Sequence, residues 1–319
     1  MALDPHQLVS EIKRRALALG FDLVGIAPAS PSIYRDYLRQ WIDEGQNGTM
    51  HYLESRFDER TNPGAYFPGA ASVICVGMNY HVHLESQESE RDSKSVPGKI
   101  ARYALGDDYH EIIKDRLHEL ADWLRATTGC QTRGSVDTAP VMEKELAARA
   151  GIGWLGKNTC IINEQIGSWL LLGEILTTLA LPLDDPATDR CGTCRRCLDA
   201  CPTGAITAPY QLEARKCISY LTIEHRGEID ETFKPQIGDW LYGCDICQDV
   251  CPWNSKAIEA LDPALLPRFP TGAIDAAEIA TWDQERYTQS LRRSAMKRVK
   301  LPQLQRNATI VRNNIQGDS

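Results

Sequence analysis

The chain has 319 residues, of which 43% are hydrophobic and 24% charged, and its formal net charge is −8. This composition is typical of a globular protein of about two domains, and it excludes a fibrous or intrinsically disordered chain. The 11 cysteines also exclude a disulfide scaffold, because such scaffolds are much shorter secreted chains and an odd number leaves one thiol unpaired.

The N-terminal segment is typical of an amphipathic helix and not of an export signal. Leu8, Ile12, Ala16 and Leu19 fall at helical spacing between charged residues. The most apolar stretch, residues 169–183, is interrupted by glycine, glutamate and proline and is too short to span a bilayer. We therefore expect a cytoplasmic protein that has no membrane contact and keeps its thiols reduced.

The first 180 or so residues alternate strand and helix signals, which favours an α/β (α+β) fold. The predicted strands are 23–27 and 72–78, and the predicted helices are 32–44, 109–127 and 141–150. The polar segment 85–98 is expected to be an exposed loop. Residues 161–163 and 169–178 are expected to pair as a hairpin around a Glu-Gln-Ile-Gly turn.

The spacing of eight cysteines between Arg190 and Pro252 predicts two iron–sulfur clusters. The run C-x2-C-x2-C-x3-C-P starts at Cys191 and is typical of bacterial ferredoxins, in which the first three thiolates bind one 4Fe–4S cluster and the fourth binds another. The same ending recurs from Cys244, without its first member, and Cys217 can supply the missing ligand. The crossing rule assigns Cys191, Cys194, Cys197 and Cys251 to cluster one, and Cys201, Cys217, Cys244 and Cys247 to cluster two.

A structural zinc site is the alternative for this block, since paired C-x2-C motifs also hold zinc. Zinc does not require a third cysteine at this spacing or a repeated C-P ending, so we favour iron–sulfur. Of the remaining cysteines, Cys75 sits in an apolar strand and is expected to be a core residue. Cys130 and Cys160 are given no role.

The chain divides into three predicted segments: residues 1–180 form an α/β domain, 181–255 hold the clusters and 256–319 form a mostly helical C-terminal segment. The last of these is locally basic. Residues 282–312 contain eight Lys or Arg and only two acidic residues, within a chain of net charge −8. Most such charge runs are simply solvated faces, but phosphate contacts with a polyanion also need a positive surface.

Several longer motifs together resemble the epoxyqueuosine reductase family, the cobalamin-dependent iron–sulfur enzymes of tRNA queuosine synthesis. They are V-G-M-N-Y (76–80), A-R-Y-A-L-G-D-D-Y-H (101–110), G-S-V-D-T-A-P-V-M-E-K-E-L-A-A-R-A-G-I-G-W-L-G-K-N (134–158) and C-I-S-Y-L-T-I-E-H-R-G (217–227). The resemblance extends from about Leu8 to Asn307.

The resemblance implies a flavin-reductase-like domain that holds cobalamin, followed by a ferredoxin-like domain with two 4Fe–4S clusters. It implies that the clusters, fed by a low-potential electron donor, reduce the corrin cobalt to Co(I). The epoxide of epoxyqueuosine at the tRNA wobble position is then reduced, its oxygen leaves as water, and queuosine results. The Asp-x-His-x-x-Gly motif that supplies a lower histidine ligand in other corrinoid proteins is absent from the sequence. We also expect a monomer.

The resemblance assigns proton donation to Asp137, and we expect an apolar corrin to raise its pKa. The alternative is a helix N-cap, because a threonine and an early proline follow Asp137. The expected cobalamin contacts are Asp137 with Arg60, Tyr103, Lys157, Asn158, Ile161, Ser219, Arg226 and Gly243. The loop 151–158 could equally be a plain glycine-rich turn, and 219–226 a solvated helix end. His110 and His118 are expected to be surface or satisfied core residues.

The expected tRNA contacts lie in the basic segment: Arg292, Arg293, Lys297, Arg298, Lys300 and Arg306. Longer family members continue into helical repeats after an Arg-Asn-Ala motif, whereas this chain ends at Ser319, so we expect a short or truncated form. Two other functions stay open: a dehalogenase-like corrinoid reductase of a small molecule, and a ferredoxin-like electron carrier.

Overall fold

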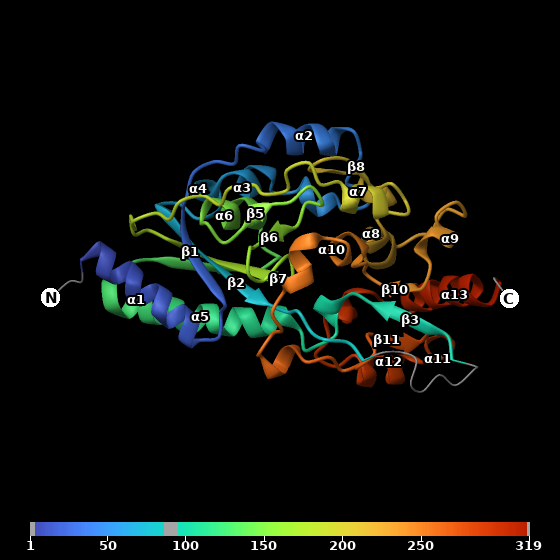
Figure 1. Ribbon diagram of the computed structural model, residues 1–319. Coiled ribbons are helices and arrows are strands. Elements are labelled where there is room, and N and C mark those ends of the chain that lie inside the picture. The colour runs from blue at the N-terminus through green and yellow to red at the C-terminus, as the bar shows by residue number, and fades with distance from the viewer. Residues whose placement is uncertain (1–3, 86–94, 318–319) are drawn as a thin grey trace.

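Four antiparallel strands form the main sheet of the computed structural model, which describes residues 4–85 and 95–317 (Figure 1). Their order is β1 (Leu23–Pro28), β2 (Ser72–Asn79), β7 (Leu170–Thr177) and β4 (Thr132–Ser135). Every residue of β2 is buried, as its continuous apolar run predicts for a central strand covered on both faces.

Helices cover both faces of this sheet. On one face, Ile74 and Val76 pack with residues of α1 (Pro5–Ala18) and α5 (Tyr109–Thr128). On the other face, Val73 packs with residues of α6 (Glu143–Arg149). The alternation along β2 follows the two-residue period of a strand. Figure 1 shows α1 and α5 on one side of the sheet and α6 on the other.

Three smaller sheets complete the strand content. In the first, β3 (Pro97–Ile100) lies between β10 (Trp240–Tyr242), to which it is parallel, and β11 (Ala273–Asp275), to which it is antiparallel. The other two are β5 (Trp154–Leu155) with β6 (Ile161–Ile162), and β8 (Ile206–Ala208) with β9 (Gln211–Leu212).

The remaining helices are short except the last. They are α2 (Arg35–Asp43), α3 (Phe57–Thr61), α4 (Pro63–Tyr66), α7 (Arg196–Ala200), α8 (Ile218–Ile223), α9 (Lys234–Ile237), α10 (Ile246–Asp249), α11 (Ala276–Thr281), α12 (Gln284–Ser290) and α13 (Leu301–Gly317). The 3₁₀ turns are η1 (His51–Leu53), η2 (Arg102–Ala104), η3 (Ala214–Lys216), η4 (Pro252–Lys256), η5 (Pro263–Leu265) and η6 (Ala295–Arg298). Within the described ranges, none of the helices is long and apolar enough to cross a membrane.

The three predicted segments pack together closely. Strand β3 of the first segment pairs with β10 of the second and β11 of the third. One hydrophobic cluster joins Leu120 of α5 to Tyr242 and to Leu304 of α13. The C-terminal segment therefore shares a core with the α/β domain.

Most predicted elements are confirmed, with small shifts at their ends. The predicted strands match β1 and β2, and the predicted helices match α2, α5 and α6. The predicted hairpin is wrong, because β6 pairs with β5 while β7 lies between β2 and β4, and only an Asn163–Gly167 bridge closes the turn. The predicted loop 85–98 is wrong at its end, where Pro97 and Gly98 belong to β3, and its residues 86–94 lie outside the described ranges.

Candidate active site

A cavity of about 1350 Å³ opens between the main sheet and the C-terminal half of the chain. Its walls come from η1 and α3, from the loop after β4, and from α5, α8 and η6. Pockets for drug-sized ligands have volumes of roughly 300–1,000 Å³. The cavity is therefore large enough for a ligand bigger than an ordinary metabolite.

Asp137 projects into this cavity from a strained loop after β4. Its backbone has a φ of +44°, a left-handed conformation that costs a non-glycine residue roughly 1–3 kcal/mol and often marks a functional position. The side chain of Glu143 accepts a hydrogen bond from the Asp137 N–H and holds the loop. The N-cap interpretation of Asp137 is wrong, because α6 begins only at Glu143 and its N-cap is Met142.

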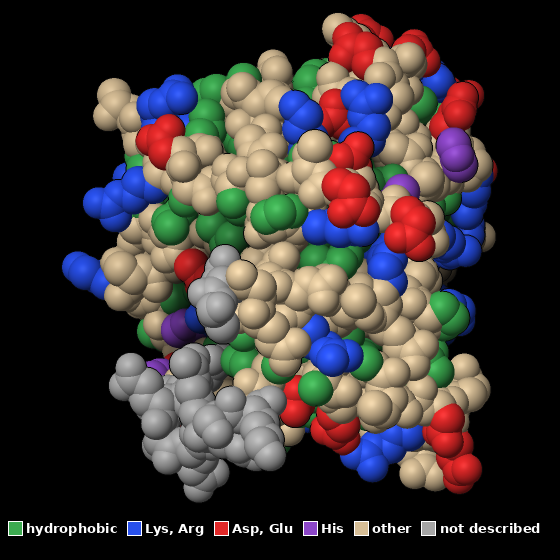
Figure 2. All heavy atoms as spheres, turned by 90° about the vertical axis from the view of Figure 1, so that its right-hand side faces the viewer, with side chains coloured by type: hydrophobic (Ala, Val, Ile, Leu, Met, Phe, Trp, Pro, Cys, Tyr) green, Lys and Arg blue, Asp and Glu red, His purple; other side chains and the backbone are tan. Residues whose placement is uncertain are grey.

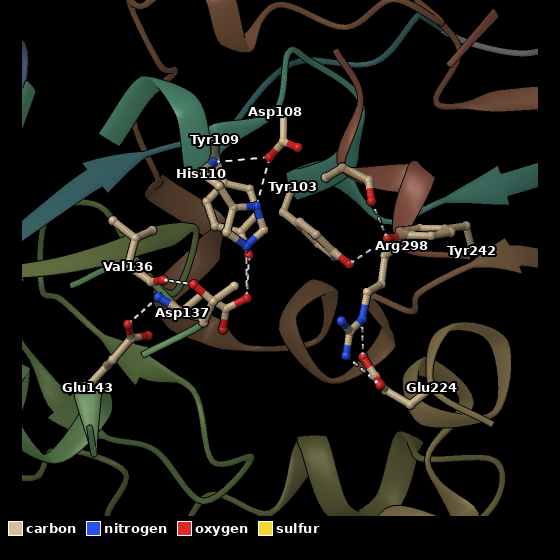
Figure 3. A network of polar contacts seen from close by, with 12 residues as sticks. Tyr103, Asp108, Tyr109, His110, Val136, Asp137, Glu143, Glu224, Tyr242 and Arg298 are labelled. Atoms are coloured by element: carbon tan, nitrogen blue, oxygen red, sulfur yellow. Dashed lines mark hydrogen bonds and ion pairs between the residues drawn. The ribbon is translucent and has the colours of Figure 1, made fainter. Parts of the chain in front are cut away.

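The Asp137 carboxylate accepts two hydrogen bonds at one oxygen, Oδ2 (Figure 3). The Tyr109 hydroxyl donates from 3.0 Å, and His110 Nε2 lies 3.1 Å away. The contact with His110 is the largest cause of a lowered Asp137 pKa, and the Tyr109 hydroxyl adds to it, against the opposing effect of burial. Two donors thus stabilise the ionised form of Asp137 in this structure. The raised pKa was expected from contact with a corrin, and it stays a prediction.

His110 also contacts a second carboxylate. Its Nδ1 lies 2.7 Å from Asp108 Oδ1, and Asp108 caps the N-terminus of α5 by accepting the His110 N–H. Burial opposes a charge on the ring, but the hydrogen bonds with Asp108 and Asp137 outweigh it and raise the pKa of His110 to about 9. The interpretation of His110 as a surface or core residue missed this role. The sequence feature that could have indicated this contact is Asp108, which lies two residues before His110 at the start of a helix.

Two carboxyl groups, the partly buried Glu143 and the fully buried Glu174, lie behind the Asp137 loop. Burial, followed by the charge of Asp137, raises the pKa of Glu143 to about 8. Glu174 lies on β7 in register with Ser135 of β4, is fully buried, and has its pKa raised by burial and by the charge of Glu143. At neutral pH these side chains are mainly uncharged, which lets a carboxyl group stay in the core.

The short helices α7 and α10, which carry Cys197 and Cys247, pack against each other. Among the described residues, no three His, Cys, Asp or Glu side chains are already arranged as a metal site. Cys217 immediately precedes α8, and Cys251 immediately precedes η4. Burial is the first cause of a raised pKa at Cys251, and the charges of Cys191 and Cys194 raise it further. The pKa of Cys244 is raised in the same way, by burial and then by Cys217 and Cys201. The cysteines that raise these two pKa values belong to the same predicted ligand sets, and the ligand assignment itself stays a prediction.

Cys217 is the cluster-two cysteine that also lines the cavity. The same cavity wall carries Asp137, Tyr109 and His110. A cluster held by Cys217 would therefore lie at the boundary of the space into which Asp137 projects.

Half of the expected cobalamin contacts lie in the cavity wall with Asp137: Arg60, Tyr103, Ser219 and Arg226. The other half lies elsewhere, namely Lys157, Asn158, Ile161 and Gly243. Lys157 Nζ donates to the Cys194 carbonyl at 2.9 Å, and Asn158 Nδ2 donates to the Cys247 carbonyl at 3.3 Å. Ile161 is buried in the core cluster that contains α6 residues, and a Cβ at Gly243, whose φ is +70°, would lie 2.5 Å from the Ala101 Cβ.

The expected tRNA contacts differ in whether their side chains already bind partners within the protein. Lys297 and Arg298 line the cavity, and Arg298 binds both oxygens of Glu224 at 3.0 and 2.9 Å. Arg306 donates to the carbonyls of Leu221, His225 and Gly227, so it holds the end of α8.

Three further basic residues, Arg292, Arg293 and Lys300, are exposed. Arg293 pairs with Asp107 at 2.7 Å. Figure 2 shows the face near the C-terminus, on which Lys and Arg alternate with Asp and Glu. Of the six expected tRNA contacts, Lys297 and Arg298 are the two that line the cavity.

This combination of an α/β sheet domain, a cysteine-rich segment and a cavity lined by titratable side chains is typical of an iron–sulfur oxidoreductase. The 4Fe-4S double cluster binding domain family matches residues 190–254, and the family described as "Epoxyqueuosine reductase QueG, DUF1730" matches residues 60–138. The chain belongs to the epoxyqueuosine reductase family.

Relatives match over nearly the whole chain. An epoxyqueuosine reductase of Xanthomonas campestris pv. campestris is 39% identical over 98% of this chain and 89% of its own length. The Escherichia coli (strain K12) protein of the same name is 38% identical over 99% of this chain and 83% of its own.

Solved structures agree in fold. The crystal structure of an epoxyqueuosine reductase with an epoxyqueuosine-modified tRNA-Tyr stem loop has a TM-score of 0.93 and 30% identity, covering 98% of this chain and 83% of its own. The Streptococcus thermophilus epoxyqueuosine reductase has a TM-score of 0.89 and 30% identity, covering 97% and 82%. The Bacillus subtilis enzyme, solved with its catalytic aspartate loop swung out of the active site, has a TM-score of 0.91 at 29% identity, covering 98% and 83%.

Proposed function

We propose that this chain reduces epoxyqueuosine to queuosine in tRNA, with cobalamin bound in the cavity and two 4Fe–4S clusters as its electron relay. The observation that carries the proposal is that Cys217, a predicted cluster ligand, and Asp137, a predicted proton donor, line one cavity. Relatives named epoxyqueuosine reductase support the proposal, and the crystal structure of one relative contains an epoxyqueuosine-modified tRNA stem loop.

The cavity fits a corrinoid by its size and by the chemistry of its walls. Tyr103 and Leu170 offer flat or apolar surface, while Ser219, Arg60 and Arg226 offer polar groups for the amide and phosphate substituents of the cofactor. These are the residues that would hold it. Cobalamin, when bound, supplies a strongly reducing cobalt centre for removal of the epoxide oxygen.

The residues of this chain have three tasks in the proposed reaction. Asp137 gives a proton to the epoxide oxygen, and its loop is held for this by Glu143. Tyr109 directs Oδ2 of Asp137 by a hydrogen bond. Ser219, Arg60 and Arg226 bind and orient the polar substituents of the bound cofactor.

We further propose that Lys297 and Arg298 bind backbone phosphates of the tRNA near the cavity, with Arg292, Arg293 and Lys300 around them. Arg298 must then break its ion pair with Glu224, or contact Glu224 and the phosphate at the same time. A low-potential donor would reduce the clusters, whose eight predicted cysteine ligands are all partly exposed. The protein would act as a cytoplasmic monomer.

An anaerobic turnover assay tests the proposal. Protein reconstituted with iron and sulfide is mixed with cobalamin, a low-potential reductant and a stem loop that carries epoxyqueuosine. Conversion to queuosine that needs both cobalamin and reductant supports it. If the protein binds no corrinoid, as judged by its absorbance spectrum, the proposal fails and an electron carrier explains the clusters better.

A further inference from the structure

Asp108, His110 and Asp137 form a chain of hydrogen bonds that ends in the cavity (Figure 3). Asp108 Oδ1 lies 2.7 Å from His110 Nδ1, and Asp137 Oδ2 lies 3.1 Å from His110 Nε2. Because ionised carboxylates only accept hydrogen bonds, both ring nitrogens must carry a proton if both contacts form. A neutral imidazole could donate to one carboxylate only. The geometry therefore fits an imidazolium between two carboxylates.

Other elements around His110 add further charged and polar groups. The Tyr109 ring stacks on the imidazole at 4.0 Å between centroids. Glu143 of α6 and Arg298 of η6 act on Asp137, and Arg268 acts on Asp108. The two aspartates make the strongest contacts with the ring, and they favour its charged form. The His110 side chain is 32% exposed, so it can exchange protons with solvent.

The proposed reaction needs more protons than Asp137 holds. Release of an epoxide oxygen as water breaks two C–O bonds and consumes two electrons and two protons. The hydrogen bonds from His110 and Tyr109 lower the pKa of Asp137, so its carboxyl group is mostly ionised at neutral pH. A proton source behind Asp137 is therefore required.

We propose that His110 is this source, that it delivers protons through Asp137, and that Asp108 holds it in the charged form. This inference rests on the proposed function of Asp137. The Nε2 proton moves to Asp137 Oδ2, Asp137 then passes this proton to the epoxide oxygen, and the electron pair of the broken C–O bond stays on the oxygen. His110, now neutral, keeps its Nδ1 proton on Asp108 and takes a new proton from solvent. A second proton transfer from His110 through Asp137 supplies the second proton, and the oxygen leaves as water. The two electrons of the new C=C bond come from the low-potential donor.

A titration of the histidine side chains by NMR tests the ionisation state without turnover. Anaerobic protein with its clusters and isotope-labelled histidine is titrated, and His110→Gln identifies the resonance. We expect His110 to titrate near pH 9. Asp137→Asn and Asp108→Asn should each lower that midpoint by about one unit or more. Asparagine caps a helix as well as aspartate does, so Asp108→Asn leaves α5 intact. A His110 midpoint near the ordinary value of about 6.5, unmoved by both substitutions, overturns the inference.

The pH dependence of single-turnover rates tests the role of His110 in delivery. His110→Gln should lower the rate at about pH 8 at least roughly 10²-fold, and the loss should shrink toward acidic pH, where Asp137 protonates directly. Added imidazole should partly restore the rate of His110→Ala. A loss that is equal at all pH values and is not rescued contradicts the relay.

The outcomes for Asp137 and His110 separate the two proposals. If Asp137→Asn is inactive while His110→Gln keeps the wild-type pH profile, the relay fails and the proposed function stands. If Asp137→Asn is fully active, the proposed function of Asp137 fails instead. His6→Gln, at an exposed position on α1, serves as the control.

Discussion

Asp137 and Cys217 lie in the wall of one cavity although they come from different parts of the fold, the loop after β4 and the start of α8. One residue belongs to a hydrogen-bonded chain of proton donors, and the other to a predicted set of four cluster thiolates. Reduction of an epoxide needs both functions at one substrate. The proposed function therefore depends on the position of these two residues in the wall of one cavity.

Replacement of Asp137 by asparagine should separate catalysis from assembly. Asp137→Asn keeps the side-chain size and the Glu143 contact to the backbone N–H, so both clusters and the fold should persist. Loss of the proton donor should lower turnover by roughly 10²–10⁴-fold. Rates measured beside iron content provide the test, with Glu231→Gln, a largely exposed carboxyl, as the control. Full activity in Asp137→Asn would show that another group donates the proton.

Replacement of Cys217 should remove one cluster selectively. Cys217→Ser is expected to lower iron and sulfide toward half, because cluster one takes its four ligands from other positions. Turnover should be lost, since the remaining cluster is cut off from the cavity. Cys130→Ser, at a position outside both ligand sets, is the matched control and should retain all iron. Unchanged iron content in Cys217→Ser would contradict the ligand assignment.

The partly buried Glu143 should make stability depend on pH. Its pKa is about 8 in the folded protein against 4.5 for an ordinary glutamate. The folded state therefore binds the proton more tightly, and the free energy of unfolding falls as the pH rises from about 4.5 to about 8. Glu143→Gln removes this titration and keeps an oxygen that can accept the Asp137 N–H.

Thermal midpoints measured anaerobically across that pH window test this expectation. The thermal midpoint of Glu143→Gln, taken relative to that of wild type, should rise by roughly a few degrees from the acidic to the alkaline end of this pH window. An exposed carboxyl replaced in the same way, in Glu231→Gln, should show no such trend. Parallel curves for Glu143→Gln and wild type would mean that Glu143 is already ionised in the folded protein.

The basic residues should divide into those that bind tRNA and those that hold the fold. Lys297→Ala should weaken tRNA binding and reduce the slope of log K against log salt by about one. Arg306→Ala should instead destabilise the protein by roughly 1–3 kcal/mol, because three backbone carbonyls lose their donor. Salt-dependent binding and thermal unfolding distinguish the two, with Arg14→Ala on α1 as the control. A salt slope unchanged by Lys297→Ala would place the phosphate contacts elsewhere.

The sequence predicted best what depends on local spacing. The cysteine intervals indicated two crossed ligand sets, and apolar runs located β1 and β2. The hairpin prediction failed because β7 finds its partners, β2 and β4, at distant positions in the chain. A short apolar run does not specify such pairing.

The chemistry around Asp137 was predicted only in part for the same reason. His110 meets Asp137 because α5 and the loop after β4 converge, and no spacing within one segment reveals that contact. Likewise, Lys157 and Asn158 lie in a motif near the family's site but contact the cluster loops in space. A motif locates a segment in the sequence, whereas the fold decides which side chains meet.

The mass of the nucleoside formed in heavy water tests the central claim most directly. Reconstituted protein, cobalamin, a low-potential reductant and epoxyqueuosine-containing tRNA are incubated anaerobically in D₂O, and the tRNA is digested after return to H₂O. Electron and proton delivery to the epoxide oxygen predicts a product that is lighter by one oxygen atom and contains no carbon-bound deuterium. An unchanged mass, or a product that keeps its oxygen and gains deuterium on carbon, would contradict the account.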